Sequence, residues 1–257
     1  MIRDTSERRQ MISAMVRERG SVQVAPLAER FGVSMQTIRK DLHFLEERGV
    51  AERSYGGAIS SDAVNVIAEP PVEMKRSMRT DEKARIGRLA ASMVSPGESI
   101  VLDSGTTTLQ IARHLPDDED ITVLTNDLDI LVELAAKQRI TVVMLGGALR
   151  RKNMAFYGAQ TVAALNDLHV DKLFLGVDGF DLERGITTHY EPEAMLNRKM
   201  VQAARQVIAV TDRSKFSRVC LHRIINVDEV DDLVTDGAVS DDVQAAGDRM
   251  GVRIHIA

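Results

Sequence analysis

The chain has 257 residues, 44% of them hydrophobic, and a formal net charge of −5 at pH 7. This composition supports one large domain or two smaller ones and excludes global disorder, and no apolar run approaches the length that spans a membrane. A single cysteine, Cys220, excludes an internal disulfide framework and any metal site built from several cysteines. No histidine–carboxylate cluster has the spacing of metal ligands. We therefore expect a cytoplasmic protein without a metal or cofactor.

The charge is distributed unevenly along the chain. Residues 1–60 contain ten Lys and Arg against eight Asp and Glu, a net charge of +2, which leaves −7 for the remainder. Turn-forming residues follow, and Glu69–Pro70–Pro71 cannot continue a helix. We therefore expect a first domain over residues 1–60, a linker over 61–79 and a second domain over 80–257.

The first domain has the pattern of three helices and a hairpin. Apolar residues recur at helical spacing between Thr5 and Gly20, around Leu27–Phe31, and from Ser34 to Gly49, and two short extended runs follow at 50–53 and 55–59. This order predicts a winged helix-turn-helix, whose second helix-turn-helix member enters the DNA major groove. A helical dimerisation hairpin with a solvated charged face is the alternative.

The expected DNA contacts come from the third helix and the hairpin. Gln and Arg side chains can make bidentate contacts with bases, whereas Ser, Thr and Lys side chains more often hold phosphates. Asp41 would repel phosphate, so we expect it to pair with an arginine such as Arg39 or to face the helix packing. The predicted DNA-binding residues are Ser34, Gln36, Thr37, Arg39, Lys40, Arg53 and Tyr55.

The second domain alternates between apolar runs and helical patterns. Alternation of this kind predicts an α/β fold with a Rossmann-like open parallel sheet, covered on both faces. Strands are predicted at 99–102, 121–125, 140–145, 172–177, 207–211, 231–235 and 252–256. Helices are predicted at 127–137, 159–168, 191–204 and 240–250, with one capped by Thr80 and one following Gly105.

The first of these strands ends in a turn suited to an anion. Ser99–Leu102 is followed by Asp103–Ser104–Gly105, and then by Thr106, Thr107 and Thr108 at the start of a helix. The first backbone N–H groups of a helix are unpaired and lie at the positive end of its dipole, where they bind phosphate.

Other polar residues follow the later strands, and ligands of such sheets bind where strands end. Turn and helix-cap chemistry is the alternative for each residue taken singly. The predicted ligand residues are Asp103, Ser104, Gly105, Thr106, Thr107, Thr108, Asn126, Gly147, Asp178, Glu191 and Lys215.

Part of the first domain resembles a known signature. Val33–Leu42, Leu45–Glu46, Gly49–Val50 and Arg53–Ala58 resemble the DNA-binding signature of the DeoR family of bacterial sugar-metabolism repressors. The resemblance implies a winged helix-turn-helix that binds double-stranded operator DNA. The second domain resembles that family throughout and, through it, the fold of ribose-5-phosphate isomerase, which implies a sensor for a phosphorylated sugar.

The same resemblance bears on catalysis. Asp178–Gly179–Phe180–Asp181 is similar to the motif that supplies catalytic carboxylates in the isomerases. The isomerases then have a glycine-rich loop with a catalytic lysine, whereas Gly185–Glu191 has neither that lysine nor the glycine cluster. The resemblance therefore implies binding without turnover, and an active isomerase with a DNA-binding appendage is the alternative.

The resemblance can be narrowed within the family. Phe174–Asp178, Asp181–Gly185 and Glu193–Arg198 resemble repressors of the N-acetylgalactosamine and galactosamine pathway. This implies a repressor of an amino-sugar operon that is relieved by a phosphorylated amino sugar, with activation as the alternative mode of control. Because winged helices usually act as pairs on repeated half-sites, we expect a homodimer or homotetramer.

Overall fold

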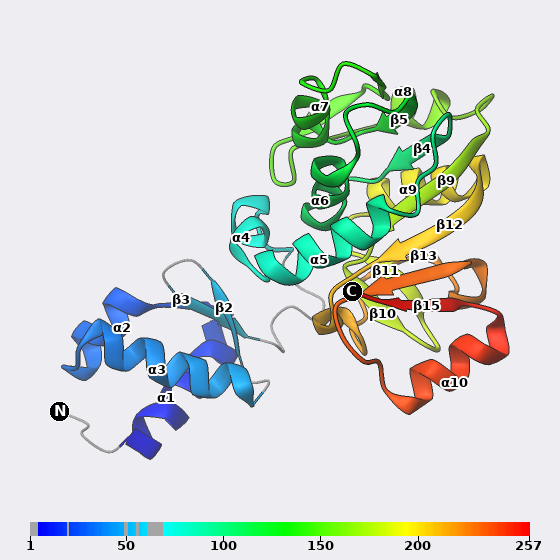
Figure 1. The fold of residues 1–257 in the computed structure, drawn as a ribbon. Coiled ribbons are helices and arrows are strands. Elements are labelled where there is room, and N and C mark those ends of the chain that lie inside the picture. The colour runs from blue at the N-terminus through cyan, green and yellow to red at the C-terminus, as the bar shows by residue number, and fades with distance from the viewer. Residues whose placement is uncertain (1–4, 20, 49–50, 55–56, 61–68) are drawn as a thin grey trace. The chain divides into compact units, whose positions relative to one another are not determined.

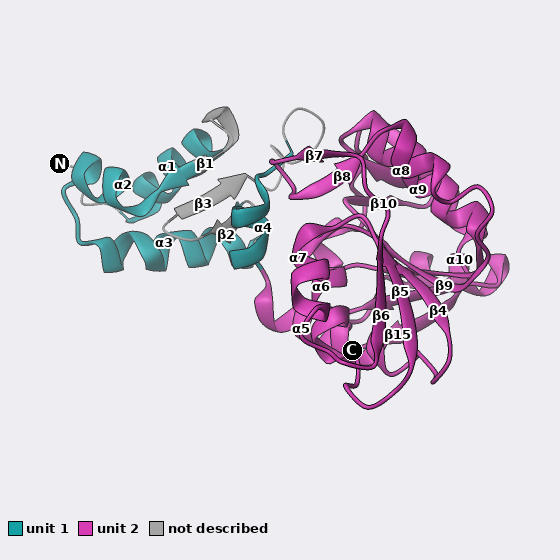
Figure 2. Ribbon diagram, turned by 90° about the horizontal axis from the view of Figure 1, so that it is seen from above, with its two compact units in different colours: residues 1–78 teal, residues 79–257 magenta. Residues whose placement is uncertain are grey.

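The computed structural model describes residues 5–19, 21–48, 51–54, 57–60 and 69–257. Of residues 17–19, 21, 52–54 and 57–60, only the backbone is described. The chain divides into two compact units, residues 1–78 and 79–257, which Figure 2 distinguishes by colour. No helix of the described residues combines the length and the apolar character needed to cross a membrane.

The first unit contains the expected three helices and hairpin. Ile12, Leu27, Phe31, Ile38 and Leu42 are among the buried side chains that join its helices into one core. The hairpin strands pair antiparallel, and β1 adds a third strand in the order β1-β3-β2. The elements are α1 (Thr5–Arg19), β1 (Ser21–Gln23), α2 (Val24–Phe31), α3 (Met35–Glu47), β2 (Ala51–Ser54), β3 (Gly57–Ser60) and α4 (Val72–Ser77).

The second unit contains a seven-stranded sheet in which every neighbouring pair is parallel (Figure 1). The strand order is β15-β14-β12-β9-β4-β5-β6. From the central pair β4 and β9, the chain continues through β5 and β6 on the β4 side and through β12, β14 and β15 on the β9 side. The strands are β4 (Ser99–Leu102), β5 (Ile121–Thr125), β6 (Ile140–Met144), β9 (Val170–Gly176), β12 (Ala204–Val210), β14 (Asp232–Thr235) and β15 (Arg253–Ile256).

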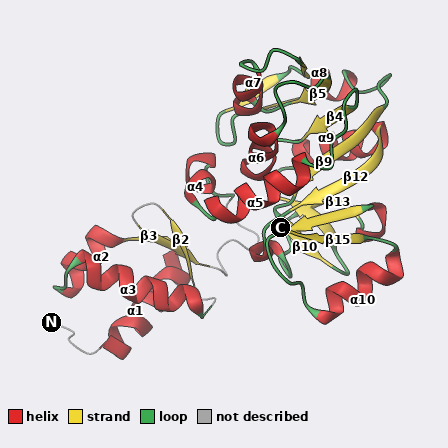
Figure 3. Ribbon diagram, in the orientation of Figure 1, coloured by secondary structure: helices red, strands yellow, loops and turns green. Residues whose placement is uncertain are grey.

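Helices cover both faces of this sheet, which Figure 3 shows as red ribbons around yellow strands. Neighbouring residues of one strand point to opposite faces, so Leu173 and Leu175 of β9 enter one core and Phe174 enters the other. The core around Phe174 includes side chains of α5 (Thr80–Ala91), α6 (Thr106–His114) and α7 (Leu128–Leu134). The opposite core includes side chains of α9 (Glu191–Ala203), with α8 (Ala159–Ala163) and α10 (Asp241–Met250) beside it.

Several local predictions need correction. Thr80 does not cap α5: it is the first helical residue, and Arg79 occupies the cap position with a left-handed backbone (φ 50°). The helix predicted at 159–168 ends at Ala163, because turn residues follow it. The hairpin β7 (Ala148–Arg150) and β8 (Ala155–Tyr157) was not predicted, and neither was the small sheet of β10 (Gly179–Asp181), β11 (Gly185–Thr188) and β13 (His222–Ile225).

Candidate nucleic-acid interface and ligand site

The candidate nucleic-acid interface is the exposed face of α3. Ile38 and Leu42 are buried, whereas Gln36, Arg39 and Lys40 are exposed on the opposite side. This spacing of three and four residues places the exposed side chains on one helical face. Of the two predicted hairpin contacts, Tyr55 lies outside the described residues, and Arg53 is described only through its backbone in β2.

Ser34 and Thr37 have a structural role at the start of α3. The Ser34 Oγ accepts the Thr37 backbone N–H (3.1 Å), and the two hydroxyls lie 2.9 Å apart. This is the N-cap interaction that satisfies one of the unpaired donors at a helix start. The cap fixes the beginning of the helix from which Gln36 and Arg39 project.

Asp41 of α3 forms ion pairs with two arginines of α1. Its carboxylate is 1% exposed and accepts Arg8 Nε (2.7 Å) and Arg9 Nε (2.8 Å). Arg9 also lies over the Phe44 ring, with its guanidinium carbon 3.9 Å from the ring centroid. Asp41 therefore faces the helix packing and pairs with arginines of α1, whereas Arg39 stays exposed because residues two apart do not face each other on a helix.

The candidate ligand site lies at the carboxyl ends of β4 and β9. Because the chain winds away from these two neighbours in opposite directions, this is the switch point at which open α/β sheets bind ligands. Asp103 follows β4, and its Oδ2 accepts the Gly176 N–H at the end of β9 (3.2 Å) and Asn197 Nδ2 of α9 (3.0 Å). Its Oδ1 is buried and accepts no hydrogen bond from the described residues. Burial raises the pKa of Asp103 to about 7.

The turn after Asp103 is held by Asp127. The Gly105 N–H donates to Asp127 Oδ2 (3.1 Å), and the Asp127 Oδ1 caps α7 by accepting the Asp129 and Ile130 N–H groups. Burial raises the pKa of Asp127 to about 7. The Thr108 hydroxyl donates back to the Gly105 carbonyl (2.9 Å), so it also stabilises the turn. The beginning of α6 is thereby fixed at the switch point.

Ser104 belongs to a buried network that the sequence did not reveal. Its Oγ lies 3.1 Å from Tyr157 Oη, which also accepts Asn153 Nδ2. Burial raises the pKa of Tyr157 well above 10, so the phenol stays neutral and keeps its proton for hydrogen bonding. Tyr157 contacts Tyr190 edge-on (5.6 Å between ring centroids), and the Arg150 guanidinium lies 4.2 Å from the centroid of the Tyr190 ring.

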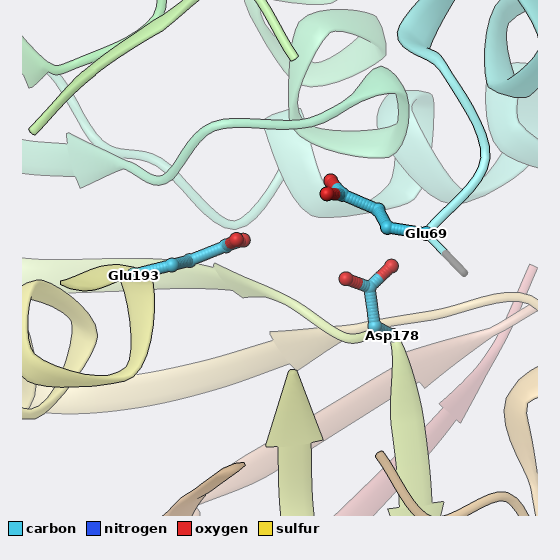
Figure 4. Close-up of side chains that lie close together, drawn as sticks. All are labelled: Glu69, Asp178 and Glu193. Atoms are coloured by element: carbon cyan, nitrogen blue, oxygen red, sulfur yellow. The ribbon is translucent and has the colours of Figure 1, made fainter. Parts of the chain in front are cut away.

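Two carboxylates adjoin the same strand ends. Asp178 follows β9 and accepts the Thr188 hydroxyl (3.3 Å), and one of its oxygens lies within 4.8 Å of an oxygen of Glu193 (Figure 4). Glu193 is 7% exposed, whereas the predicted Glu191 is exposed at the start of α9. Of the two glutamates in the first turn of that helix, the predicted Glu191 is the less enclosed.

Asn126 and Gly147 hold the hairpin β7–β8 against the strand ends. Asn126 is fully buried after β5 and donates to the Phe156 carbonyl (3.1 Å). Gly147 follows β6 with φ 109°, and a Cβ there would lie 2.7 Å from the Tyr157 carbonyl and closer still to Thr161 Oγ1. Both residues therefore act on the position of Tyr157.

Lys215 lies after β12 in the short helical turn η1 (Arg213–Lys215) and is half-buried. Burial of Asp212 opposes its ionisation, but the charges of Lys215 and Arg79 and the Ser214 hydroxyl outweigh that effect and lower the pKa of Asp212. Lys215 and the start of α6 both lie at the carboxyl edge of the sheet. They follow strands that are not neighbours, because β9 lies between β12 and β4.

These features define a class of protein: a winged DNA-binding unit in one chain with a parallel α/β unit that carries a ligand site. Family comparisons agree. Residues 8–64 match the DeoR-like helix-turn-helix domain, and residues 78–237 match the DeoR C terminal sensor domain. The chain belongs to the DeoR family, and it is a transcriptional repressor rather than an enzyme.

Relatives matched by sequence are consistent with this assignment. The chain is 43% identical to a "Putative aga operon transcriptional repressor" of Escherichia coli O157:H7, over 97% of this chain and 93% of the relative. It is 37% identical to the HTH-type transcriptional repressor GlcR of Bacillus subtilis (strain 168), over 86% of this chain and 84% of that relative. Among solved structures, ribose 5-phosphate isomerase A of Methanocaldococcus jannaschii matches with 16% identity and a TM-score of 0.40, over 53% of this chain and 54% of the other.

Proposed function

We propose that this protein represses an operon for amino-sugar catabolism and that a phosphorylated amino sugar relieves the repression. N-acetylgalactosamine 6-phosphate and galactosamine 6-phosphate are the two candidates. The match to a sensor domain and the 43% identity to an aga operon repressor support a sugar-phosphate effector of this kind. The observation that carries the proposal is the start of α6 at the sheet's switch point.

The start of α6 offers donors to a phosphate. The first N–H groups of a helix have no partner within it, and the helix dipole favours an anion there. The Thr106 and Thr107 hydroxyls make no hydrogen bond with the other described residues, in contrast to the Thr108 hydroxyl. We therefore assign the phosphate to Thr106 and Thr107, with Ser104, Gly105 and Thr108 shaping the turn and Lys215 adding positive charge; the Gly105 N–H already donates to Asp127.

The sugar would be read by acceptors around this turn. Asp103 Oδ1 and Asn126 Oδ1 are buried and receive no hydrogen bond from the described part of the chain. An unsatisfied buried acceptor costs about 1–3 kcal/mol, so a sugar hydroxyl or amino group that reaches it gains affinity. Asp178, which already accepts the Thr188 hydroxyl, is a further candidate acceptor for the sugar, and Gly147 and Glu191 contribute through the position of the surrounding backbone and the start of α9.

The DNA would be read by the exposed face of α3. Gln36 and Arg39 are assigned to base edges and Lys40 to phosphate, with Ser34 and Thr37 at the helix start and the hairpin residues Arg53 and Tyr55 as further contacts. In functional terms, residues 1–60 bind DNA, 61–79 link the domains and 80–257 sense the effector. Since winged helices usually act in pairs on repeated half-sites, the repressor would be a homodimer or homotetramer that acts in the cytoplasm.

A thermal-shift screen of hexosamine, hexose and pentose phosphates tests the effector assignment. A ligand at 100 times its dissociation constant stabilises the folded protein by about 2.7 kcal/mol, and we expect that stabilisation from an amino-sugar phosphate. Thr107→Glu places a negative charge where the phosphate binds and removes the stabilisation. Gln138→Glu adds the same charge at an exposed position before β6 and retains it. Equal stabilisation of both variants would show that the phosphate binds elsewhere.

A further inference from the structure

Asp212 is a buried carboxylate that serves two elements at once. It follows β12 at the carboxyl edge of the sheet and is 3% exposed. On one side it begins the turn η1, where it accepts the backbone N–H of Ser214 (3.0 Å) and the Ser214 hydroxyl. That turn carries Lys215, the lysine assigned to the effector.

On its other side, Asp212 holds the residue at which the second unit begins. Arg79 Nε lies 3.4 Å from Asp212 Oδ1, and a second ion pair joins Arg79 to Glu82 (3.8 Å). Arg79 is the cap residue of α5, and its carbonyl accepts the Lys83 N–H (3.0 Å). Its left-handed backbone (φ 50°) is a conformation that arginine rarely adopts, so tertiary contacts must hold it there.

Several positively charged side chains surround the Asp212 carboxylate. Against the opposing effect of burial, the positive charges of Lys215, Arg79 and the buried Lys83 lower the pKa of Asp212, and the Arg79 guanidinium lies at ion-pair distance from its carboxylate (3.4 Å). Asp236 fixes the neighbouring residue of the turn by accepting the Arg213 N–H (2.7 Å). A phosphate that attracts Lys215 would compete with Asp212 for that lysine, because both are anions that require the same cation.

We propose that Asp212 is the positioning residue that transmits effector occupancy from the η1 turn to Arg79, where the chain leaves the sensor unit toward the DNA-binding unit. This inference rests on the proposed function, because it assigns a route to the effector response. An effector shifts the repressor only if it favours one arrangement of the chain over another. Asp212 permits two such arrangements. In the first, its carboxylate pairs with Arg79 (3.4 Å) in the field of the nearby Lys215 charge, and its carbonyl accepts the Lys215 backbone N–H (3.1 Å). In the second, the Lys215 charge is drawn to the phosphate, and the strength of the Asp212–Arg79 ion pair changes.

The test compares Asp212→Asn with Asp232→Asn as a matched control. Asp232 is also a buried carboxylate of this sheet, 1% exposed and paired with Arg253 (2.7 Å), but it begins β14 at the opposite, amino edge. Each full-length protein is titrated onto an operator duplex that the wild type selects from a random-sequence library. The titration is run alone and with galactosamine 6-phosphate, N-acetylgalactosamine 6-phosphate or inorganic phosphate, and thermal shift reports ligand binding separately.

Three outcomes support the inference together. First, the wild type and Asp232→Asn lose operator affinity by the same factor when the sugar phosphate is added. Second, Asp212→Asn still shows the thermal shift that the ligand causes. Third, adding the ligand changes the operator affinity of Asp212→Asn by less than about twofold. A purely structural role would lower the melting temperature of Asp212→Asn and leave its effector response intact, which would overturn the inference. Loss of the ligand's thermal shift in Asp212→Asn would also overturn it, because Asp212 would then act in binding.

A second variant keeps the test decisive if Asp212→Asn does not fold. Arg79→Gln removes the partner charge at a side chain that is 24% exposed, and the inference predicts the same uncoupling, with Arg79→Lys restoring part of the response. A wild-type response in Arg79→Gln overturns the inference. Absence of any response or thermal shift in the wild type refutes the proposed function instead, so the two failures are distinguishable.

Discussion

Asp103→Asn should change how the stability of this protein depends on pH. The Asp103 carboxyl group is 1% exposed, and burial raises its pKa from the ordinary value of 3.8 to about 7. The folded state therefore binds this proton more tightly than the unfolded chain does. As a consequence, Asp103 contributes a loss of stability to the wild type as the pH rises from about 4 to about 7, and the asparagine variant lacks this contribution.

The size of the effect follows from the pKa. Each pH unit between the unfolded and the folded pKa corresponds to about 1.4 kcal/mol for a single group. Between pH 5 and pH 7, the free energy of unfolding of the variant relative to the wild type should therefore rise by about 2–3 kcal/mol. Asp127 titrates in the same range but is present in both proteins, so its contribution largely cancels in the difference.

Urea unfolding of both proteins at pH 5, 6, 7 and 8 measures this difference directly. The expected result is a difference that grows up to about pH 7 and is constant above it. A difference that stays constant across the whole range would show that Asp103 keeps an ordinary pKa. The electrostatic description of the switch point, in which the carboxylate charge is costly until a ligand donates to Oδ1, would then be refuted.

Three further substitutions test other parts of the structure. Arg39→Ala should weaken operator binding by about 1–3 kcal/mol in a gel shift while effector binding persists, and Arg249→Ala on α10 should leave operator binding unchanged. Asp41→Ala leaves the buried Arg8 without its carboxylate partner and should destabilise the first unit by about 3–5 kcal/mol. Hydrogen exchange should then show lost protection in α1 and α3 but unchanged protection in the seven-stranded sheet. Gly147→Ala should cost about 1–3 kcal/mol more than Gly146→Ala in urea unfolding, because both glycines have positive φ but only Gly147 lacks room for a Cβ; equal costs would contradict that clash.

Much of the fold is predictable from local patterns. The apolar runs that end in Leu102 and Thr125 become β4 and β5, and Ser34 is the N-cap of α3 as its position before a helical pattern indicates. These features depend on periodicity and capping, which act within a few residues. The parallel sheet follows from the alternation of strands and helices, and the switch point follows from the strand order.

The site is less predictable because its inner residues depend on tertiary packing. Tyr157 reaches Ser104 only because an unpredicted hairpin of two three-residue strands folds over the strand ends. Asn197 was recoverable in principle, since it is a polar residue within the buried side of α9, beside Leu196 and Met200. Glu193 shares that side, whereas Glu191 does not, and this distinction requires the rotation of the helix against the sheet.

The most direct test of the account is the dissociation constant of the wild-type repressor for its operator, measured with and without galactosamine 6-phosphate or N-acetylgalactosamine 6-phosphate. We expect one of them to raise this constant by about 5- to 150-fold, the usual range of allosteric coupling, and the corresponding sugars without phosphate to leave it unchanged. An operator affinity that neither sugar phosphate changes would contradict the account.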